Sequence, residues 1–312
     1  MPFIPKNLLV IAMLFFLFIS CSQEPIEPTT ADLQFKKQQS QADELDNSAL
    51  EGLFYPKKIT KDVSYGAHPE EKFDIYLPAG RSYLKTKVLI VLHGGGWTNG
   101  DKSGMENFVE QLWHDNPNHA IVNMNYVLAD ASNPAFPNQF QNIRAVIAFL
   151  TNNNVHFKIK PEFALLGNSS GGHLSLMYDY VYDLNDQVKF VSTTVGPTDF
   201  TDPYYQNMPN FEELMELLVD ENVYPNIEEN LDVLSPAHNT SHSSSPTIMF
   251  YGENDPIVPY ANAITLYQEL QESGVPTSFH TYEGGHNNWS AEDNNHKHQQ
   301  LNAFIQQYLP IE

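Results

Sequence analysis

The chain has 312 residues, of which 41% are hydrophobic and 12% aromatic, so it can bury one large core and requires no second domain. Its formal net charge of −22 disfavours binding to nucleic acid or to an anionic membrane surface through a basic patch. The single cysteine, Cys21, excludes an intrachain disulfide and a metal or redox site built from two thiols.

The N-terminus has the pattern of a targeting segment. Lys6 precedes an unbroken apolar run over 8–19, which is too short to cross a bilayer comfortably and is typical of a signal peptide. Ser20-Cys21-Ser22 then resembles the lipobox of bacterial lipoproteins, although Phe18 stands where leucine is usual. The resemblance implies cleavage before Cys21, acylation of this residue and a lipid-anchored protein of the bacterial cell envelope, outside the cytoplasm. The alternative is a secreted protein whose cleavage site happens to contain a cysteine.

Composition then divides the rest of the chain. We expect a signal peptide over 1–20, a polar tether over 21–56 and one folded domain over 57–312. Membrane association is therefore expected only through the lipid anchor, and the sequence does not specify an oligomeric state.

Within the folded domain, strand-like and helix-like segments alternate. The segment 72–77 has the alternating pattern of a half-buried antiparallel strand, whereas 88–92 is apolar on both faces and suits a central parallel strand. The remaining expected strands are 59–65, 120–126, 163–167, 189–195, 247–251 and one around His280, and the expected helices are 106–114, 140–150, 174–182, 212–219 and 260–273. This order predicts an α/β protein, with a mostly parallel central sheet and helices on both faces.

A Gly-x-Ser-x-Gly motif lies between the strand at 163–167 and the following helix, with Ser169 at its centre. A serine at such a tight turn projects its hydroxyl over the sheet edge, where the first helical amides favour developing negative charge. Ser169 is therefore the candidate nucleophile. The alternative for the motif alone is an ordinary Gly/Ser turn.

A second glycine-rich loop, His93-Gly94-Gly95-Gly96-Trp97, follows the strand at 88–92. Glycines at a strand end allow backbone amides to approach an anion. We expect the amides of Gly95, Gly96 and Ser170 to form an oxyanion hole.

Two further groups follow later strands. Asp255 lies in a loop before the helix at 260–273 and is the candidate orienting acid, while His286 lies in a glycine-rich loop and is the candidate general base. The chain order Ser, Asp, His is the one used by α/β-hydrolases. The competing histidines and acids, which suit structural or solvated roles better, are His280, His296, His298, Glu253, Asp199 and Asp202.

These motifs carry a family resemblance over roughly residues 57–309. The glycine loop followed by Gly100-Asp101-Lys102, together with 167–174, resembles the α/β-hydrolase superfamily, and within it bacterial carboxylesterases of the hormone-sensitive-lipase and feruloyl-esterase types. Arylformamidases are similar in the same loop. Ser170 stands where many relatives have alanine, with little effect expected because only its N–H is used. The polar tether also differs from the helical N-terminal cap of hormone-sensitive-lipase relatives, which leaves an inherited lid and the chain-length selectivity in question.

The resemblance implies a serine esterase that forms an acyl-enzyme and needs neither a metal nor an organic cofactor. Its substrates would be small acyl or aryl esters, with acetyl and feruloyl esters of plant polysaccharides as candidates. We expect 200–245 to form a cap over the pocket, with Trp97, Tyr204 and Trp289 as pocket side chains. An amide hydrolase of the arylformamidase type, a prolyl-oligopeptidase-type peptidase and a non-catalytic surface binding protein are the alternatives.

Overall fold

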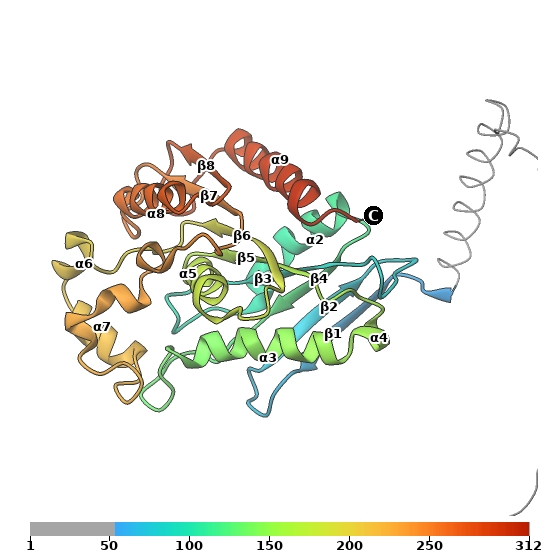
Figure 1. Cartoon of the computed structure of the whole chain (residues 1–312), viewed down its shortest axis with the longest axis horizontal. Helices are drawn as coiled ribbons and strands as arrows, with labels where there is room; N and C mark the ends of the chain where they lie inside the picture. Colours follow the sequence, from blue (N-terminus) through green and yellow to red (C-terminus); the bar gives the residue numbers. More distant parts are fainter. Residues whose placement is uncertain (1–53, 312) are drawn as a thin grey trace, which may run out of the picture. The chain divides into compact units, whose positions relative to one another are not determined.

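The computed structural model describes residues 54–311, which contain an eight-stranded sheet in the order β1-β2-β4-β3-β5-β6-β7-β8 (Figure 1). Strand β2 pairs antiparallel with β1 and β4, and all other neighbours are parallel. The predicted mostly parallel sheet is confirmed. The strands are β1 Lys58–Ser64, β2 Lys72–Leu77, β3 Val88–Leu92, β4 Ala120–Met124, β5 Phe163–Asn168, β6 Val188–Thr194, β7 Thr247–Gly252 and β8 Thr277–Tyr282.

Helices cover both faces of the sheet, as the alternation of segments predicted. Side chains of α3, α5 and α8 pack in the core on one face, and those of α2 and α9 pack in the core on the other (Figure 1). The α-helices are α2 Glu106–Asp115, α3 Asn138–Asn152, α4 Asn154–Phe157, α5 Ser170–Met177, α6 Pro203–Gln206, α7 Phe211–Leu218, α8 Tyr260–Glu272 and α9 Ala291–Tyr308. The shorter turns are η1 Lys102–Met105, η2 Tyr178–Tyr182, η3 Ile227–Glu229, η4 Leu231–Leu234 and η5 Pro236–Asn239.

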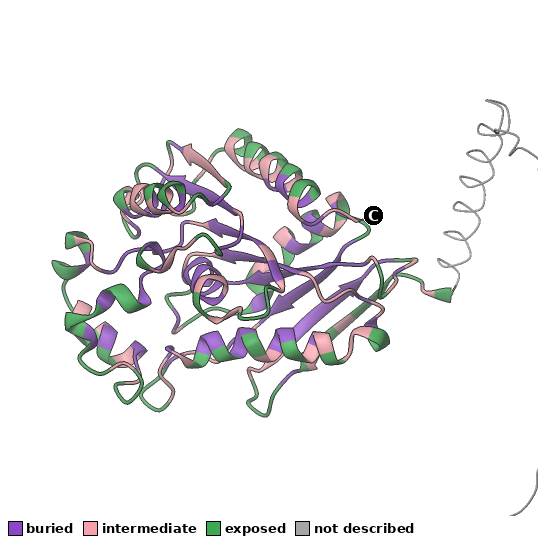
Figure 2. Ribbon diagram, viewed as in Figure 1, coloured by how far each residue is buried: buried purple, intermediate pink, exposed green. Residues whose placement is uncertain are grey.

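The central strands are buried along their whole length (Figure 2). In β3, Val88, Ile90 and Leu92 belong to one core, while Leu89 and Val91 belong to the other. Alternate side chains of a strand point to opposite faces, so an unbroken apolar run is what a strand covered on both sides requires. The sequence interpretation of 88–92 is confirmed.

Two local predictions were wrong. The helix expected at 174–182 begins at Ser170, directly after Ser169, and ends as a π-helical turn, η2. Strand β2 is antiparallel but not half-buried, because Tyr76 packs against Trp113 of α2 with ring centroids 5.5 Å apart. The alternation of polar and apolar residues in β2 arises because one polar residue carries a buried charge, and not because one face of the strand is exposed to solvent.

That charge is Asp74, whose side chain is only 1% exposed. Its carboxylate lies 2.8 Å from the Lys102 ammonium and 3.0 Å from that of Lys61, and it accepts a hydrogen bond from the Asp62 amide. Burial alone would raise the pKa of Asp74, but these partners lower it below the usual value. Because Lys102 closely follows the glycine loop, the ion pair fixes the end of this loop against the sheet.

The expected signal peptide, Cys21 and the tether up to residue 53 lie outside the described residues. In the part of the chain from 54 to 311, no helix combines the length and the apolar character needed to cross a bilayer.

Asp74→Asn should lower the free energy of unfolding by about 3–5 kcal/mol, because it removes the buried carboxylate that pairs with Lys102 and Lys61 and leaves the buried Lys102 ammonium with only the exposed Asp62 as its partner. Asp62→Asn is the matched control: it removes a partner of the same ammonium, but the Asp62 side chain is 62% exposed, so the loss should stay under about 1 kcal/mol. Urea unfolding followed by circular dichroism measures both. Equal losses in the two variants would contradict the role given to Asp74.

Candidate active site

Ser169 occupies a strained turn between β5 and α5. Its φ of 51° and ψ of −122° are unusual for a residue with a side chain, and such backbone strain costs on the order of 1–3 kcal/mol. A Cβ added at Gly167 would lie 2.1 Å from the Gly171 carbonyl oxygen, and one at Gly171 would lie 2.4 Å from that of His93. The two glycines of the motif are therefore required for the strand, the helix and the glycine loop to meet at the serine.

Hydrogen bonds join Ser169, His286 and Asp255 into a chain. His286 Nε2 lies 2.9 Å from Ser169 Oγ, and His286 Nδ1 lies 2.7 Å from Asp255 Oδ2. Because a carboxylate only accepts hydrogen bonds, Nδ1 carries the proton and Nε2 is free to accept the serine hydroxyl. The structure thus brings the three predicted residues together.

Asp255 is held firmly in this arrangement. Its side chain is fully buried, and its second oxygen accepts hydrogen bonds from the amides of Ile257 and Val258 at 2.8 and 3.0 Å. These bonds compensate the burial of the carboxylate and fix the oxygen that faces His286.

The competing residues have other partners. His280 contacts the Ser278 hydroxyl, His296 contacts the Tyr282 hydroxyl, Glu253 accepts a hydrogen bond from Thr281, Asp199 pairs with His238, and Asp202 caps α6. His298 stacks on Phe108 with ring centroids 5.8 Å apart. None of these side chains lines the cavity at Ser169 that the described residues form.

The glycine loop lies beside the serine. A Cβ at Gly94 would come within 3.0 Å of the Ser169 Cβ, and both Gly95 and Gly96 have positive φ, of 135° and 61°. Within residues 54–311, the amides of Gly95, Gly96 and Ser170 donate no hydrogen bond. Three amides near one hydroxyl, without acceptors of their own, are suited to receive an oxyanion.

A cavity of about 710 Å³ opens at Ser169 and His286. One wall comes from the glycine loop, including Trp97, and another from the loop after Asp255. The segment expected to form a cap supplies a third wall, which consists of Phe200, Tyr205, Met208, Phe211, Leu214, Met215 and Leu218. The cavity has the size and the mainly apolar lining of a small-molecule site.

Two predicted pocket residues do not line this cavity. The Tyr204 hydroxyl donates a hydrogen bond to the Pro256 carbonyl at 2.5 Å, so Tyr204 ties α6 to the loop that carries Asp255. Trp289 donates from Nε1 to the Gly285 carbonyl at 2.7 Å and packs on Tyr282, so it supports the loop that carries His286. The sequence placed both side chains near the site but could not show in which direction they point.

Trp97, the third predicted pocket residue, lines the cavity and is fixed by His173. Trp97 Nε1 lies 3.3 Å from His173 Nδ1, and His173 Nε2 lies 2.9 Å from the Leu234 carbonyl oxygen. Because indole only donates and a carbonyl only accepts, His173 is a neutral imidazole with its proton on Nε2. Burial lowers the pKa of His173 to about 4, despite the hydrogen bond to Leu234. Sequence reasoning named His173 within the motif but gave it no role.

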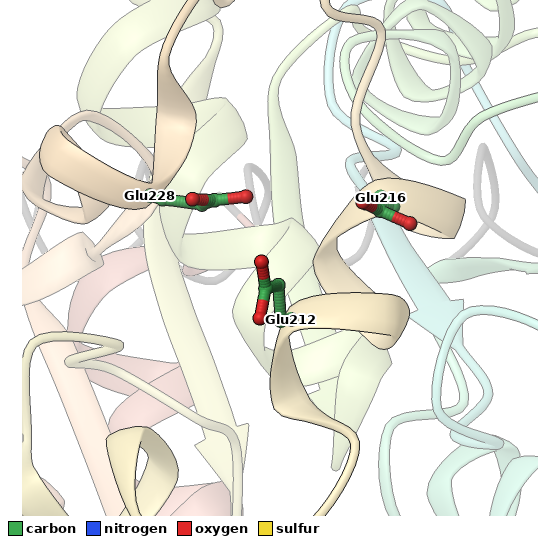
Figure 3. Close-up of side chains that lie close together, drawn as sticks. All are labelled: Glu212, Glu216 and Glu228. Atoms are coloured by element: carbon green, nitrogen blue, oxygen red, sulfur yellow. The ribbon is translucent and has the colours of Figure 1, made fainter.

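Glu212 and Glu216 of α7 and Glu228 of η3 lie close together, with one carboxylate oxygen from each within 4.8 Å of the others (Figure 3). All three side chains are exposed on the cap. Exposed carboxylates remain well solvated, so the group does not by itself define a metal site.

The parallel sheet and the hydrogen-bonded Ser–His–Asp chain at the carboxyl ends of its strands are those of an α/β-hydrolase. The chain belongs to the BD-FAE family of α/β-hydrolase esterases, which matches residues 73–270.

Individual proteins with similar sequences are also described as esterases. The esterase LipQ of Mycobacterium tuberculosis is 27% identical over 241 residues, which cover 70% of this chain and 54% of LipQ. A probable isoprenylcysteine alpha-carbonyl methylesterase of Oryza sativa subsp. japonica is 22% identical over 253 residues, or 74% of this chain and 57% of the relative. The chain thus spans little more than half the length of these curated relatives.

A solved structure described as a truncated form of a carbohydrate esterase from gut microbiota shares the fold. Its TM-score is 0.68 at 19% identity, and the match covers 81% of this chain and 96% of that one.

The stability of the protein should depend on pH through His173. The unfolded chain takes up a proton near pH 6.5, whereas the folded state resists protonation down to about pH 4. The contribution of neutral His173 is therefore complete above pH 6.5, and up to about 3 kcal/mol is lost as the pH falls toward 4. His173→Gln should be less stable at pH 7.5 but should show a smaller loss over this range.

Urea unfolding of both proteins at several pH values measures this difference. Asp179, whose pKa burial raises to about 7, acts in the opposite direction, and subtraction of the two profiles removes its contribution. Parallel profiles would contradict a neutral, buried His173.

Proposed function

We propose that this chain is a serine carboxylesterase that hydrolyses small acyl or aryl esters through an acyl-enzyme. The observation that carries the proposal is the continuous chain of hydrogen bonds from Asp255 through His286 to Ser169, at the floor of a mainly apolar cavity. Membership of an esterase family supports the choice of esters as substrates.

The geometry supports a two-step reaction. His286 Nε2 accepts the proton of Ser169 as the serine oxygen attacks the ester carbonyl, and Asp255 stabilises the imidazolium that forms. The imidazolium then gives this proton to the leaving alcohol, and the acyl-enzyme remains. In the second step His286 activates a water molecule, which releases the acid and restores Ser169.

The amides of Gly95, Gly96 and Ser170 would stabilise the tetrahedral intermediates. Ser170 is the first residue of α5, so its N–H also lies at the positive end of the helix dipole. The loss of one such donor typically raises the barrier by about 3 kcal/mol. Many relatives have alanine where this chain has Ser170. Because the amide belongs to the backbone, the serine side chain does not change its ability to stabilise the oxyanion.

Acetyl or feruloyl groups on plant polysaccharide are the natural substrates that we propose. A cavity of about 710 Å³ accommodates an aryl group. The carbohydrate esterase with the same fold supports this class. Hydrolysis of acetylated xylan and of feruloylated arabinoxylan, compared with 4-nitrophenyl acetate, tests it, and indifference to both polysaccharides would remove it.

Hydrolysis assays also distinguish the esterase from the alternative functions. An arylformamidase would prefer an N-formyl aryl amine to the matched aryl ester, and a prolyl-oligopeptidase-type enzyme would cleave a proline-containing peptide. A surface binding protein would turn over none of these compounds. A preference for the aryl ester, measured as kcat/KM, is the result that we expect.

Ser169→Ala should reduce kcat for 4-nitrophenyl acetate by about 10⁴-fold or more, because the variant has no nucleophile. His286→Gln should have an effect of similar size, whereas His280→Gln is the matched control, since His280 contacts Ser278 and lies outside the cavity. Steady-state kinetics measures all three. Turnover by Ser169→Ala at the wild-type rate would end the esterase proposal.

We also propose that the mature protein is anchored in the bacterial cell envelope by lipid on Cys21, as the lipobox-like sequence suggests. Cys21→Ala should move the protein from the membrane fraction to the soluble extract and abolish labelling by a palmitate analogue. Labelling that persists in the variant would contradict the anchor.

A further inference from the structure

A second cavity, of about 160 Å³, lies on the face of the sheet that α2 and α9 cover (Figure 1). Four polar side chains line it: Asn168 at the end of β5, Ser192 and Thr194 in the last part of β6, and Lys297 of α9. The apolar part of its lining consists of Met105, Phe108, Leu166, Phe250 and Leu301. The cavity therefore combines several polar groups with an apolar surface.

The polar side chains of this cavity have no hydrogen-bonding partner. Within residues 54–311, the side chains of Asn168, Ser192 and Thr194 form no hydrogen bond, and Lys297 forms neither a hydrogen bond nor an ion pair. The polar atoms that are both fully buried and unpaired in this part of the chain belong to other residues, so these four side chains keep accessible polar atoms. Ser192 as a whole is only 3% exposed, and its accessible hydroxyl opens into the cavity that it lines.

Lys297 brings a positive charge to the cavity. Its ammonium lies 5.6 Å from the ring centroid of Phe108 and 5.5 Å from that of Trp289. The rings attract the charge but accept no conventional hydrogen bond, so the N–H groups of Lys297 remain available. Burial lowers the pKa of Lys297 to about 8, which leaves the ammonium mostly charged at neutral pH.

The missing partner of Lys297 is an anion. The chain carries 38 acidic residues, yet no carboxylate of the described residues pairs with this ammonium. A charge that is largely withdrawn from water is costly unless it is paired, so the cavity favours a negatively charged occupant.

The lining of the cavity selects the class of anion. An ammonium and two hydroxyls can donate hydrogen bonds to the oxygens of a carboxylate. The apolar side chains suit a short hydrocarbon tail, which inorganic phosphate and sulfate lack. The volume of about 160 Å³ restricts this tail to a few carbon atoms.

From this cluster we infer that the second cavity is a binding site for a small aliphatic carboxylate, of the size of propionate. Lys297, Ser192 and Thr194 bind the carboxylate group, and the apolar side chains surround the tail. Binding at this site requires no reaction at Ser169.

The position of the site connects it with the proposed active site. Asn168 and Met105 line both cavities, and Asn168 directly precedes Ser169. Lys297 lies over the ring of Trp289, which holds the loop of His286 through the Gly285 carbonyl. A carboxylate is also the class of product that ester hydrolysis releases, so the second cavity would hold the acid product apart from the nucleophile. This consequence rests on the proposed esterase function, whereas the binding itself does not.

Isothermal titration calorimetry of the purified protein with sodium propionate, at constant ionic strength, tests the inference. Propionamide, which has the same tail without the charge, and inorganic phosphate, which has the charge without the tail, are the comparison ligands. The wild type should bind propionate saturably and with an affinity about 10-fold or more above that for either comparison ligand.

Three variants locate the binding. Lys297→Met keeps a long apolar side chain but removes the ammonium, and it should weaken propionate binding by about 10-fold or more. Lys57→Met is the matched control, because the exposed Lys57 ammonium also lies over a tryptophan ring, 4.7 Å from the centroid of Trp113, but outside the cavity. Its affinity should equal that of the wild type. Thr194→Val keeps the volume of the side chain and removes one hydroxyl, so it should weaken binding by about 3-fold or more.

The contrary outcomes are equally clear. A wild type that binds no propionate, or binds propionamide or phosphate as tightly, overturns the carboxylate site. An affinity that is unchanged in Lys297→Met places the binding elsewhere, for example at Ser169, and also overturns it. If Lys297→Met does not fold, an unchanged affinity in Thr194→Val has the same meaning. Turnover of 4-nitrophenyl acetate by the wild type tests the esterase function separately, so a failure of either proposal can be recognised.

Discussion

The hydrogen bond between His286 and Ser169 joins side chains that are 117 residues apart in the sequence, and the rest of the domain holds its two ends in place. Ser169 follows β5, His286 follows β8 and Asp255 follows β7. Because these strands are parallel, their carboxyl ends lie along one edge of the sheet, and the loops after them can meet there. The parallel sheet is thus the condition for the site.

Backbone packing around the serine is as constrained as the side chains. The carbonyl of His93 lies where a side chain at position 171 would be, so the glycine loop and the start of α5 are in direct contact. This contact places the amides of Gly95, Gly96 and Ser170, which donate no hydrogen bond within residues 54–311, around the serine. The ion pair between Lys102 and Asp74 fixes the far end of the loop. A buried charge in a strand remote from the chemistry therefore helps to define the shape of the site.

The aromatic residues near the site have two different functions. Trp97, Phe200, Tyr205 and Phe211 form a wall of the cavity, whereas Tyr204 and Trp289 brace the loops that carry Asp255 and His286. Both kinds of residue lie close to the catalytic groups in sequence or in space. Only the direction of the side chain distinguishes them, and in each bracing residue that direction is fixed by a hydrogen bond to a backbone carbonyl.

The sequence by itself predicted the mostly parallel sheet and the serine turn, because apolar periodicity and glycine spacing are local signals of backbone geometry. Asp255 and His286 were candidates because they follow later strands in the Ser, Asp, His order of α/β-hydrolases, and the structure joins both to Ser169 in one chain of hydrogen bonds. It could not determine that β2 is covered on both faces, since a buried aspartate looks like a solvent-facing one until Lys102 is brought beside it. Likewise, the neighbouring Tyr204 and Tyr205 are equivalent as sequence, and tertiary packing alone decided that Tyr204 bonds to a backbone carbonyl while Tyr205 forms part of the cavity wall. Such choices depend on contacts between residues that are far apart in the chain, and those contacts exist only once the fold has formed.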